Sequence, residues 1–351
     1  MPVDSSARVL ALAEDRLEER LAALFRHFDA TWGAAPLQRS CRLADSRVEI
    51  RSGLQNYLDL CDLALLSADL PGAEGGRFLV SCSGSDACPE LRWSSPFFRE
   101  REIESALRDT RYRLHFHADL GFWQAYDRES GRGWQIMRDK SGFPAWDPGS
   151  PLRNLMHWHL SETGGSLIHA GTLLHAGRGA LFAGGGGAGK SGTVIAGILQ
   201  GLRTVGDDYV GVKPASLRAY PVFKTLKQDE QGVARLGLQG HRAIGAERNW
   251  QNKYQFSVDQ IGHGVLADSI PIDVVLLPRV TGHASTRFEP VSAIEAFLAL
   301  APSGVSQIPG DRTVQARAAA TLLRQVPSYC LWLGTKPSEI VAALCEFLEN
   351  L

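Results

Sequence analysis

The residues of this chain best suited to chemistry lie in the run Gly-Gly-Gly-Gly-Ala-Gly-Lys-Ser that begins at position 184. They complete the phosphate-binding pattern G-x-x-x-x-G-K-[ST]. In such a loop, backbone N–H groups point at phosphate oxygens, the lysine ammonium reaches the outer phosphates, and the hydroxyl helps to hold Mg²⁺. The pattern predicts a site for a nucleotide triphosphate, ATP or alternatively GTP, formed by Gly184, Gly185, Gly186, Gly187, Ala188, Gly189, Lys190, Ser191 and Gly192.

The segments on either side of the loop are those that a phosphate site needs. The apolar run from Ala180 to Ala183 is typical of a buried parallel strand, and apolar residues recur at helical spacing from Val194 to Leu199. Gly201 stands where a left-handed helix stop is expected. The helix N-terminus then faces the loop, and its unpaired N–H groups add to anion binding. A flexible glycine linker would lack these flanks, so we favour the phosphate loop.

Two adjacent acids, Asp207 and Asp208, follow a short strand-like segment from Arg203 to Gly206. Carboxylates beside a phosphate loop can hold Mg²⁺ and accept the proton of an attacking hydroxyl. A solvated Gly-Asp-Asp turn is the alternative, but the position after the loop favours a function. We expect Lys190 to offset phosphoryl charge, Asp207 to act as base, and Ser191 with Asp208 to hold the metal. The order of the two aspartates is open at this point.

Composition restricts the possible partners. The chain has 351 residues, 37 Lys and Arg against 38 Asp and Glu, and a formal net charge of −1, so no overall field favours nucleic acid or an anionic membrane. The N-terminal residues lack a signal-peptide pattern, and no apolar run is long enough to span a bilayer. We therefore predict a cytoplasmic protein without nucleic-acid or membrane partners, and self-association is left open. Six cysteines without metal-ligand spacing are expected to be free thiols, namely Cys41, Cys61, Cys82, Cys88, Cys330 and Cys345.

The hydrophobic pattern divides the chain near residue 150. An amphipathic helix is expected over residues 5 to 28, and residues 45 to 146 are expected to be mostly strands, as at Arg47 to Ile50, Arg77 to Ser81, Tyr112 to Phe116 and Gly133 to Met137. We predict an N-terminal α+β domain over 1–150, a candidate for substrate or partner recognition, and a P-loop α/β domain over 151–351. The sheet core is expected to contain His115, His117, Trp123, Tyr126 and Trp134.

The stretch from Leu167 to Val212 resembles the HPr serine kinase family, whose catalytic fold is shared with the phosphoenolpyruvate carboxykinases. It has, in order, a histidine followed by a small residue (His169 and Ala170), a strand, the Gly-Lys-Ser loop, a glycine-ended helix and the Asp pair. Weaker likeness extends over roughly half the chain, at Tyr220 to Leu226, Asn252 to Tyr254, Pro271 to Arg279 and Gln325 to Leu348.

The resemblance implies a P-loop catalytic domain with a mixed sheet and flanking helices. It also implies that His169 orients the base or the acceptor, for which a structural histidine is the alternative. Phosphate contacts commonly come from several segments, so Lys224, Lys227 and Lys253 are further candidates. A solvated strand edge is the alternative for each lysine, and it is least convincing for Lys253.

Two departures from the family limit the expected activity. Gly192 stands where many members carry Glu or Thr, and the glycine-rich, arginine-containing block of bifunctional kinase/phosphorylases is absent after the acids. The chain is more similar to divergent HPr-kinase-like proteins encoded beside peptide-modification enzymes. We predict an ATP- and Mg²⁺-dependent kinase whose acceptor is a serine hydroxyl of a peptide or protein. The alternatives are a small-molecule alcohol kinase and a non-catalytic nucleotide switch, whereas carboxykinase activity would need a further Lys and His set.

Overall fold

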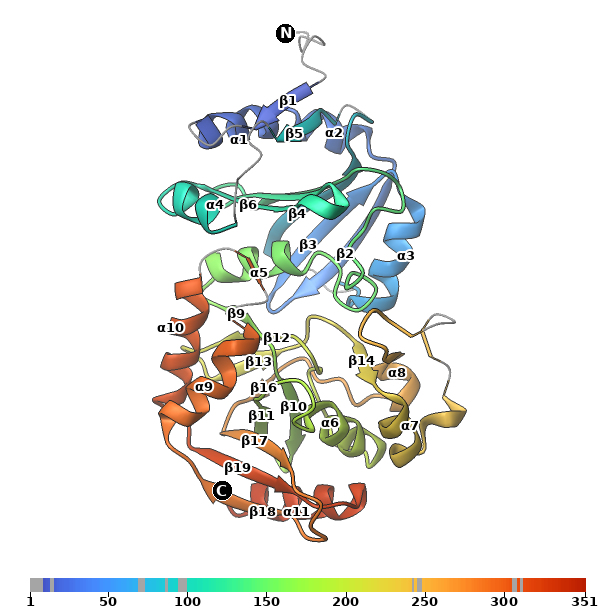
Figure 1. Ribbon diagram of the computed structural model, residues 1–351, viewed down its shortest axis with the longest axis vertical. Helices are drawn as coiled ribbons and strands as arrows, with labels where there is room; N and C mark the ends of the chain where they lie inside the picture. Colours follow the sequence, from blue (N-terminus) through green and yellow to red (C-terminus); the bar gives the residue numbers. More distant parts are fainter. Residues whose placement is uncertain are drawn as a thin grey trace.

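The computed structural model shows an α/β protein that combines several mixed sheets with helices (Figure 1). The first half of the chain supplies a six-stranded sheet, and the second half supplies a five-stranded and a four-stranded sheet. In the view of Figure 1 the two halves lie one above the other. The structure describes residues 9–12, 16–68, 73–85, 88–93, 100–241, 243–244, 248–304, 308–309 and 312–351.

The six-stranded sheet confirms the mostly β character expected for residues 45 to 146. Its strand order is β2-β3-β4-β8-β7-β6, with parallel pairing between β3 and β4 and between β4 and β8. All four strand segments expected from alternation lie within these strands. Trp123, Tyr126 and Trp134 are buried in this region, as expected. The strands are β2 (Leu37–Leu43), β3 (Ser46–Ser52), β4 (Ala73–Cys82), β6 (Tyr112–His117), β7 (Phe122–Asp127) and β8 (Arg132–Met137).

The single helix expected over residues 5 to 28 is partly wrong. Strand β1 (Val9–Leu12) pairs in parallel with β5 (Glu90–Trp93), and helices α1 (Leu17–Arg26) and α2 (Phe28–Ala34) follow it. Residues 5 to 8 and 13 to 15 lie outside the described residues. Periodicity in a short segment cannot show that a distant strand offers it backbone hydrogen bonds. The remaining helical elements of this half are α3 (Gln55–Ala64), α4 (Glu100–Leu107) and the 3₁₀ turn η2 (Ala118–Leu120).

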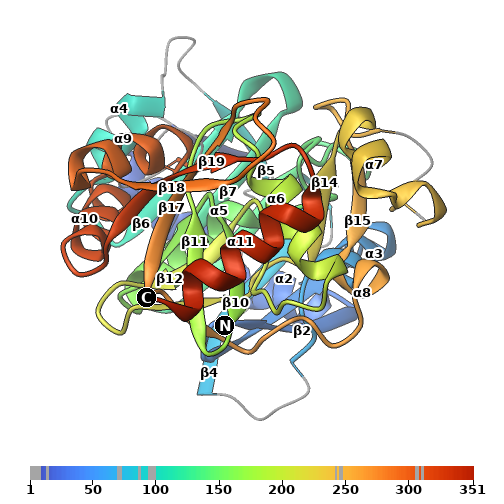
Figure 2. The same cartoon turned by 90° about the horizontal axis from the view of Figure 1, so that it is seen from below.

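The five-stranded sheet of the second half has helices on both faces. The neighbouring strands β11, β17 and β19 run parallel to one another. In sheet order the strands are β10 (Gly171–His175), β11 (Arg178–Phe182), β17 (Val274–Val280), β19 (Ser328–Leu333) and β18 (Arg287–Pro290). Side chains alternate across it, so Phe182 joins the core under α6 (Lys190–Leu199) and α11 (Pro337–Glu349), whereas Leu181 joins the core under α9 (Ala293–Gly304) and α10 (Arg312–Leu323). Figure 2 shows α6 and α11 side by side over the sheet.

Smaller elements connect the two halves. Helix α5 (Arg153–Glu162) contacts both β7 and β9 (Ser166–Ile168), and one buried cluster contains Phe78, Trp158 and Phe223. The predicted domains 1–150 and 151–351 therefore share a hydrophobic core. The remaining elements are β12 (Val210–Lys213), β13 (Arg218–Tyr220), β14 (Thr225–Gln228), α7 (Glu230–Leu236), η3 (Leu238–Gly240), β15 (Tyr254–Ser257), α8 (Val258–Ile261) and β16 (Ile270–Pro271).

Two further expectations concern the whole chain. The six cysteines, all of them within the described residues, form no disulfide. Within the described part of the chain, every helix is too short or too polar to serve as a membrane span.

Candidate functional site

The glycine-rich loop runs from the end of β11 to the start of α6, so the strand and helix expected on its flanks are both present. Gly189 is the residue before the helix and has a φ of 105°, in the left-handed region that favours glycine. A Cβ at Gly189 would also collide with the Leu333 side chain. Only glycine satisfies both conditions, so local sequence and tertiary packing together fix the loop at the helix N-terminus.

The Lys190 side chain is hydrogen-bonded to the backbone of the loop. Its Nζ donates hydrogen bonds to the carbonyl oxygens of Gly184, at 2.5 Å, and Gly185, at 3.1 Å. Burial lowers the pKa of Lys190, and the charges of Asp207 and Asp208 partly oppose that shift. A buried ammonium beside free helix N–H groups is suited to neutralising phosphate oxygens.

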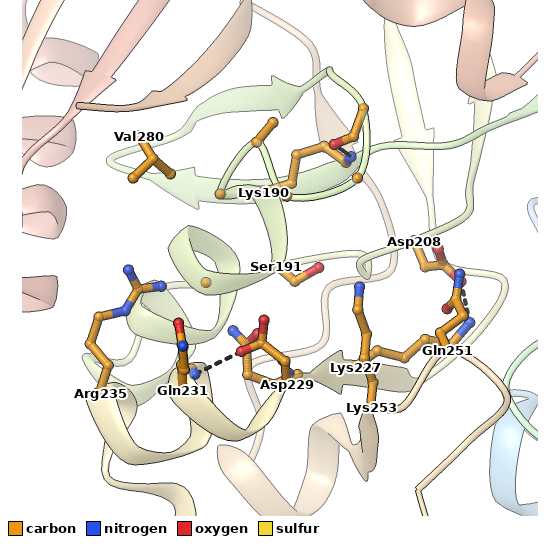
Figure 3. A pocket seen from close by; sticks show the side chains of 18 of the residues that line it. Lys190, Ser191, Asp208, Lys227, Asp229, Gln231, Arg235, Gln251, Lys253 and Val280 are labelled. Atoms are coloured by element: carbon orange, nitrogen blue, oxygen red, sulfur yellow. Dashed lines mark hydrogen bonds and ion pairs between the residues drawn. The ribbon is translucent and has the colours of Figure 1, made fainter. Parts of the chain in front are cut away.

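A cavity of 440 Å³ opens in front of this loop. Among its lining residues, four cations, Lys190, Lys227, Arg235 and Lys253, face two carboxylates, Asp208 and Asp229. Figure 3 shows Arg235 at one end of the cavity and Asp208 at the other, with Ser191 and Lys253 between them. The excess positive charge and the concave shape favour a polyphosphate.

Asp207, unlike Asp208, is absent from the lining of the cavity among the described residues. It is 1% exposed, and neither carboxylate oxygen has a partner with hydrogen-bond geometry within the described chain. Burial raises the pKa of Asp207, while the nearby Ser191 hydroxyl acts to lower it. Gly171 makes room for this carboxylate, since a Cβ there would lie 2.9 Å from Oδ1. Such a site favours either a proton or a cation beside Asp207.

Asp208 lines the cavity and is held from two sides. Its Oδ2 accepts from Lys227 Nζ at 2.6 Å, and its Oδ1 lies 3.0 Å from His169 Nε2. Burial acts to raise the pKa of Asp208, but Lys227 and His169 more than reverse this and hold that pKa well below its ordinary value. The carboxylate is therefore kept ionised at the edge of the cavity.

Strand pairing brings His169 to Asp208. Strands β9 and β12 are antiparallel, with Ile168 opposite Val210, so the adjoining residues His169 and Tyr209 come together and their rings lie 5.3 Å apart. Asp208 itself has a φ of 75°, a conformation that costs free energy in a non-glycine residue and is often found at functional sites. The histidine that the family resemblance singled out thus contacts the acidic pair.

The candidate lysines fall in different places. Lys253 and Lys227 line the loop cavity, whereas Lys224 lines a separate cavity with Arg39 and Asp62. Side chains alternate along an extended segment, so Lys224 and Lys227, three residues apart, point to opposite sides. The structure therefore puts Lys227 against Asp208, and it leaves Lys224 away from the glycine-rich loop.

Arg235 is a cavity residue that sequence reasoning missed. It stands in the last turn of α7, and a Cβ at Gly192 would lie 2.8 Å from its Nη2. The glycine at position 192, which departs from the family pattern, therefore leaves room for this guanidinium beside the loop. No local signal marks Arg235, because α7 follows the phosphate loop by some forty residues of chain.

The metal expected beside the loop would have few protein ligands. In the described part of the chain, no group of three or more His, Cys, Asp or Glu side chains is arranged to hold an ion. Mg²⁺ bound with a nucleotide commonly takes one or two protein oxygens and completes its shell with phosphate and water. The Ser191 hydroxyl and the unpartnered Asp207 carboxylate fit this need. The sequence-based set of Ser191 and Asp208 is less suitable, because Asp208 is already paired with Lys227 and His169.

Comparisons with known proteins find only weak similarity, and it is to solved structures. No protein-family model matches the chain, and no curated protein matches it. Among solved structures, the HPr(Ser) kinase/phosphatase from Coxiella burnetii is 14% identical over 53% of this chain and 99% of its own, with a TM-score of 0.27. The function proposed below rests on the geometry of the site.

Proposed function

We propose that this protein is a kinase that transfers the terminal phosphoryl group of ATP to an alcohol hydroxyl. The observation that carries this proposal is the ionised Asp208, held by Lys227 and His169 on the wall of the cavity that contains Lys190 and the phosphate loop. Phosphoryl transfer needs charge neutralisation, in-line positioning and a place for the acceptor proton. The site supplies groups for each of these needs.

The cationic side chains bind and orient the nucleotide. Lys190 and the N-terminal amides of α6 contact the outer phosphates, while Lys253 and Arg235 approach them from other segments. When bound, Mg²⁺ supplies further neutralisation of the phosphate charge, and Ser191 and Asp207 would hold it. These residues place the terminal phosphorus near Asp208.

Asp208 is the proposed general base, which reverses the order expected from the sequence. The acceptor oxygen forms a bond to the terminal phosphorus, the bond from phosphorus to the bridging oxygen breaks, and the nucleoside diphosphate leaves with that electron pair. The hydroxyl proton passes to Asp208. His169 is a positioning residue, because its Nε2 contacts Oδ1 of the Asp208 carboxylate. Asp207 lies beside the Ser191 hydroxyl but does not itself line the cavity, so it is less well placed than Asp208 to accept a proton from an acceptor there.

The acceptor is proposed to be a serine of a peptide or protein, with a small-molecule alcohol as the alternative. The test is incubation with γ-labelled ATP, Mg²⁺ and serine-containing peptides, followed by detection of labelled product. Asp208→Asn is expected to keep nucleotide affinity within about twofold and to lower turnover by at least about a hundredfold.

The matched control is Asp62→Asn, which removes an aspartate from an exposed ion pair with Arg39 and should leave transfer unchanged. Nucleotide binding without labelled product for any peptide or small alcohol would contradict the kinase proposal and favour a non-catalytic switch. Full turnover by Asp208→Asn would contradict its role as base.

A further inference from the structure

A second cavity, of 310 Å³, meets the phosphate-loop cavity at three shared residues. These are Asp208, Lys227 and Gln251, so the proposed base stands between the two spaces. The first half of the chain supplies much of the remaining wall. The other lining residues are Glu100, His115, His117, Trp146, Arg153, Asn154, Tyr209, Trp250 and Pro309.

This placement corrects one expectation from the sequence. His115 and His117 were assigned to the core of the sheet, whereas both line the second cavity at the end of β6. Burial lowers the pKa of His115 to about 4, so its imidazole is uncharged at neutral pH. The charged residues of the wall also balance, since Arg153 and Lys227 stand with Asp208 and Glu100. The space is therefore suited to an uncharged group.

A buried polar chain fixes the hydrogen-bonding character of Asn154. Gln135 Nε2 donates to the Asp147 carboxylate, Gln124 Nε2 donates to Gln135 Oε1, and Asn154 Nδ2 donates to Gln124 Oε1. Asp147 Oδ2 accepts from both the Tyr57 hydroxyl and Gln135 Nε2, and this sets the direction of each amide in turn. Asn154 belongs to the cavity wall, and its Oδ1 is left as a buried acceptor without a partner among the described residues. An occupant that donates an N–H or O–H would satisfy it.

The edge of this cavity carries an exposed aromatic ring. Trp250 is 60% exposed although it lines the space, so the cavity reaches the surface there. Further inside, the Arg153 guanidinium lies 5.4 Å from the Trp146 ring centre and 5.0 Å from that of Tyr209. Aromatic rings that remain accessible at the mouth of a site commonly cover apolar groups of a bound partner. A small alcohol held inside the cavity would leave Trp250 uncovered.

We propose that the second cavity binds the acceptor as an extended, uncharged peptide segment, whose serine hydroxyl reaches Asp208 while a neighbouring residue covers Trp250. This inference rests on the proposed kinase function and names the substrate and its binding site. A backbone N–H of the segment donates to Asn154 Oδ1. The serine oxygen forms the new bond to phosphorus and its proton passes to Asp208, as in the step above. Substrate recognition thus uses residues from both halves of the chain.

The test uses the full-length protein, γ-labelled ATP and a library of short peptides with a fixed serine and varied neighbours. The wild type is expected to select uncharged residues beside the serine. Trp250→Ala is expected to raise KM for the best peptide about tenfold, with kcat and nucleotide affinity changed less than about twofold. Asn154→Leu, which removes the acceptor oxygen, is expected to raise the same KM. Ile294→Ala, also at an exposed apolar side chain, is the matched control and should change nothing.

Three results would overturn the inference. Labelling of free serine or glycerol, but of no peptide, would make the acceptor a small alcohol. Equal kinetics for Trp250→Ala and Ile294→Ala would show that the Trp250 ring does not contact the bound peptide. Failure of the wild type to bind ATP at all would overturn the kinase proposal itself, and a direct titration with ATP distinguishes this result from the other two.

Discussion

The ion pair between Asp208 and Lys227 allows a quantitative test of the site. Its two side chains are 22% and 8% exposed, and the charged atoms lie 2.6 Å apart. With an effective dielectric constant near 20, two unit charges at this distance attract each other by about 6 kcal/mol before the cost of desolvation. Removing only Asp208 leaves the Lys227 ammonium buried without its carboxylate, a change that costs about 3 to 5 kcal/mol in buried pairs.

We therefore expect Asp208→Asn to lower the free energy of unfolding by about 3 kcal/mol, since Asn can still accept from Lys227. Lys227→Met should cost about 2 kcal/mol, because His169 still contacts Asp208. The double variant should cost clearly less than the sum, with a coupling energy of about 2 to 3 kcal/mol. Urea unfolding followed by tryptophan fluorescence measures all three values.

Two further measurements check this reasoning. Because the folded-state pKa of Asp208 is depressed, its stabilising contribution is present at neutral pH and is lost as the pH falls below about 4. The difference between wild type and Asp208→Asn should shrink in the same direction. Asp62→Asn, in an exposed pair, should cost less than about 1 kcal/mol. Strictly additive effects of Asp208→Asn and Lys227→Met would refute the coupling.

Three other predictions concern single residues. Burial raises the pKa of Asp147 to about 7 although hydrogen bonds oppose it, so the folded protein should lose up to about 4 kcal/mol of stability as pH rises from about 4 to 7. Asp147→Asn should remove this dependence in urea unfolding at different pH values, and an unchanged pH profile would contradict the assignment. Gly189→Ala should abolish ATP binding measured by calorimetry, whereas Gly240→Ala, outside the cavity and with open space for a Cβ, should retain it; equal affinities would contradict the loop geometry. Arg235→Met should raise the Kd for ATP about tenfold without changing stability, and an unaltered Kd would exclude a phosphate contact.

The local features of the site could be predicted from the sequence because they depend on short-range rules. The apolar run before the loop, the glycines within it and the helical spacing after it specify a strand, a turn and a helix, and β11 and α6 have these positions. Gly201, with a φ of 84°, follows the end of α6 in the left-handed conformation expected of a helix stop. Leu199 is one exception, since it is exposed at the helix end although it fits the apolar spacing.

Contacts between distant segments could not be predicted in the same way. The pairing of β9 with β12 decides that His169 meets Asp208, and the face of β14 decides that Lys227 rather than Lys224 reaches the cavity. The second cavity depends on β6 and α5 coming against the Asp pair from another sheet.

The sequence by itself therefore determined a glycine-rich loop, its flanking elements and a nearby pair of acids. Only the tertiary structure decided which acid faces the cavity, which cations surround it and which residues stand on its far side. The physical reason is range: backbone propensity and side-chain periodicity act within a few residues, whereas charge pairing and burial depend on which elements the packed core brings together.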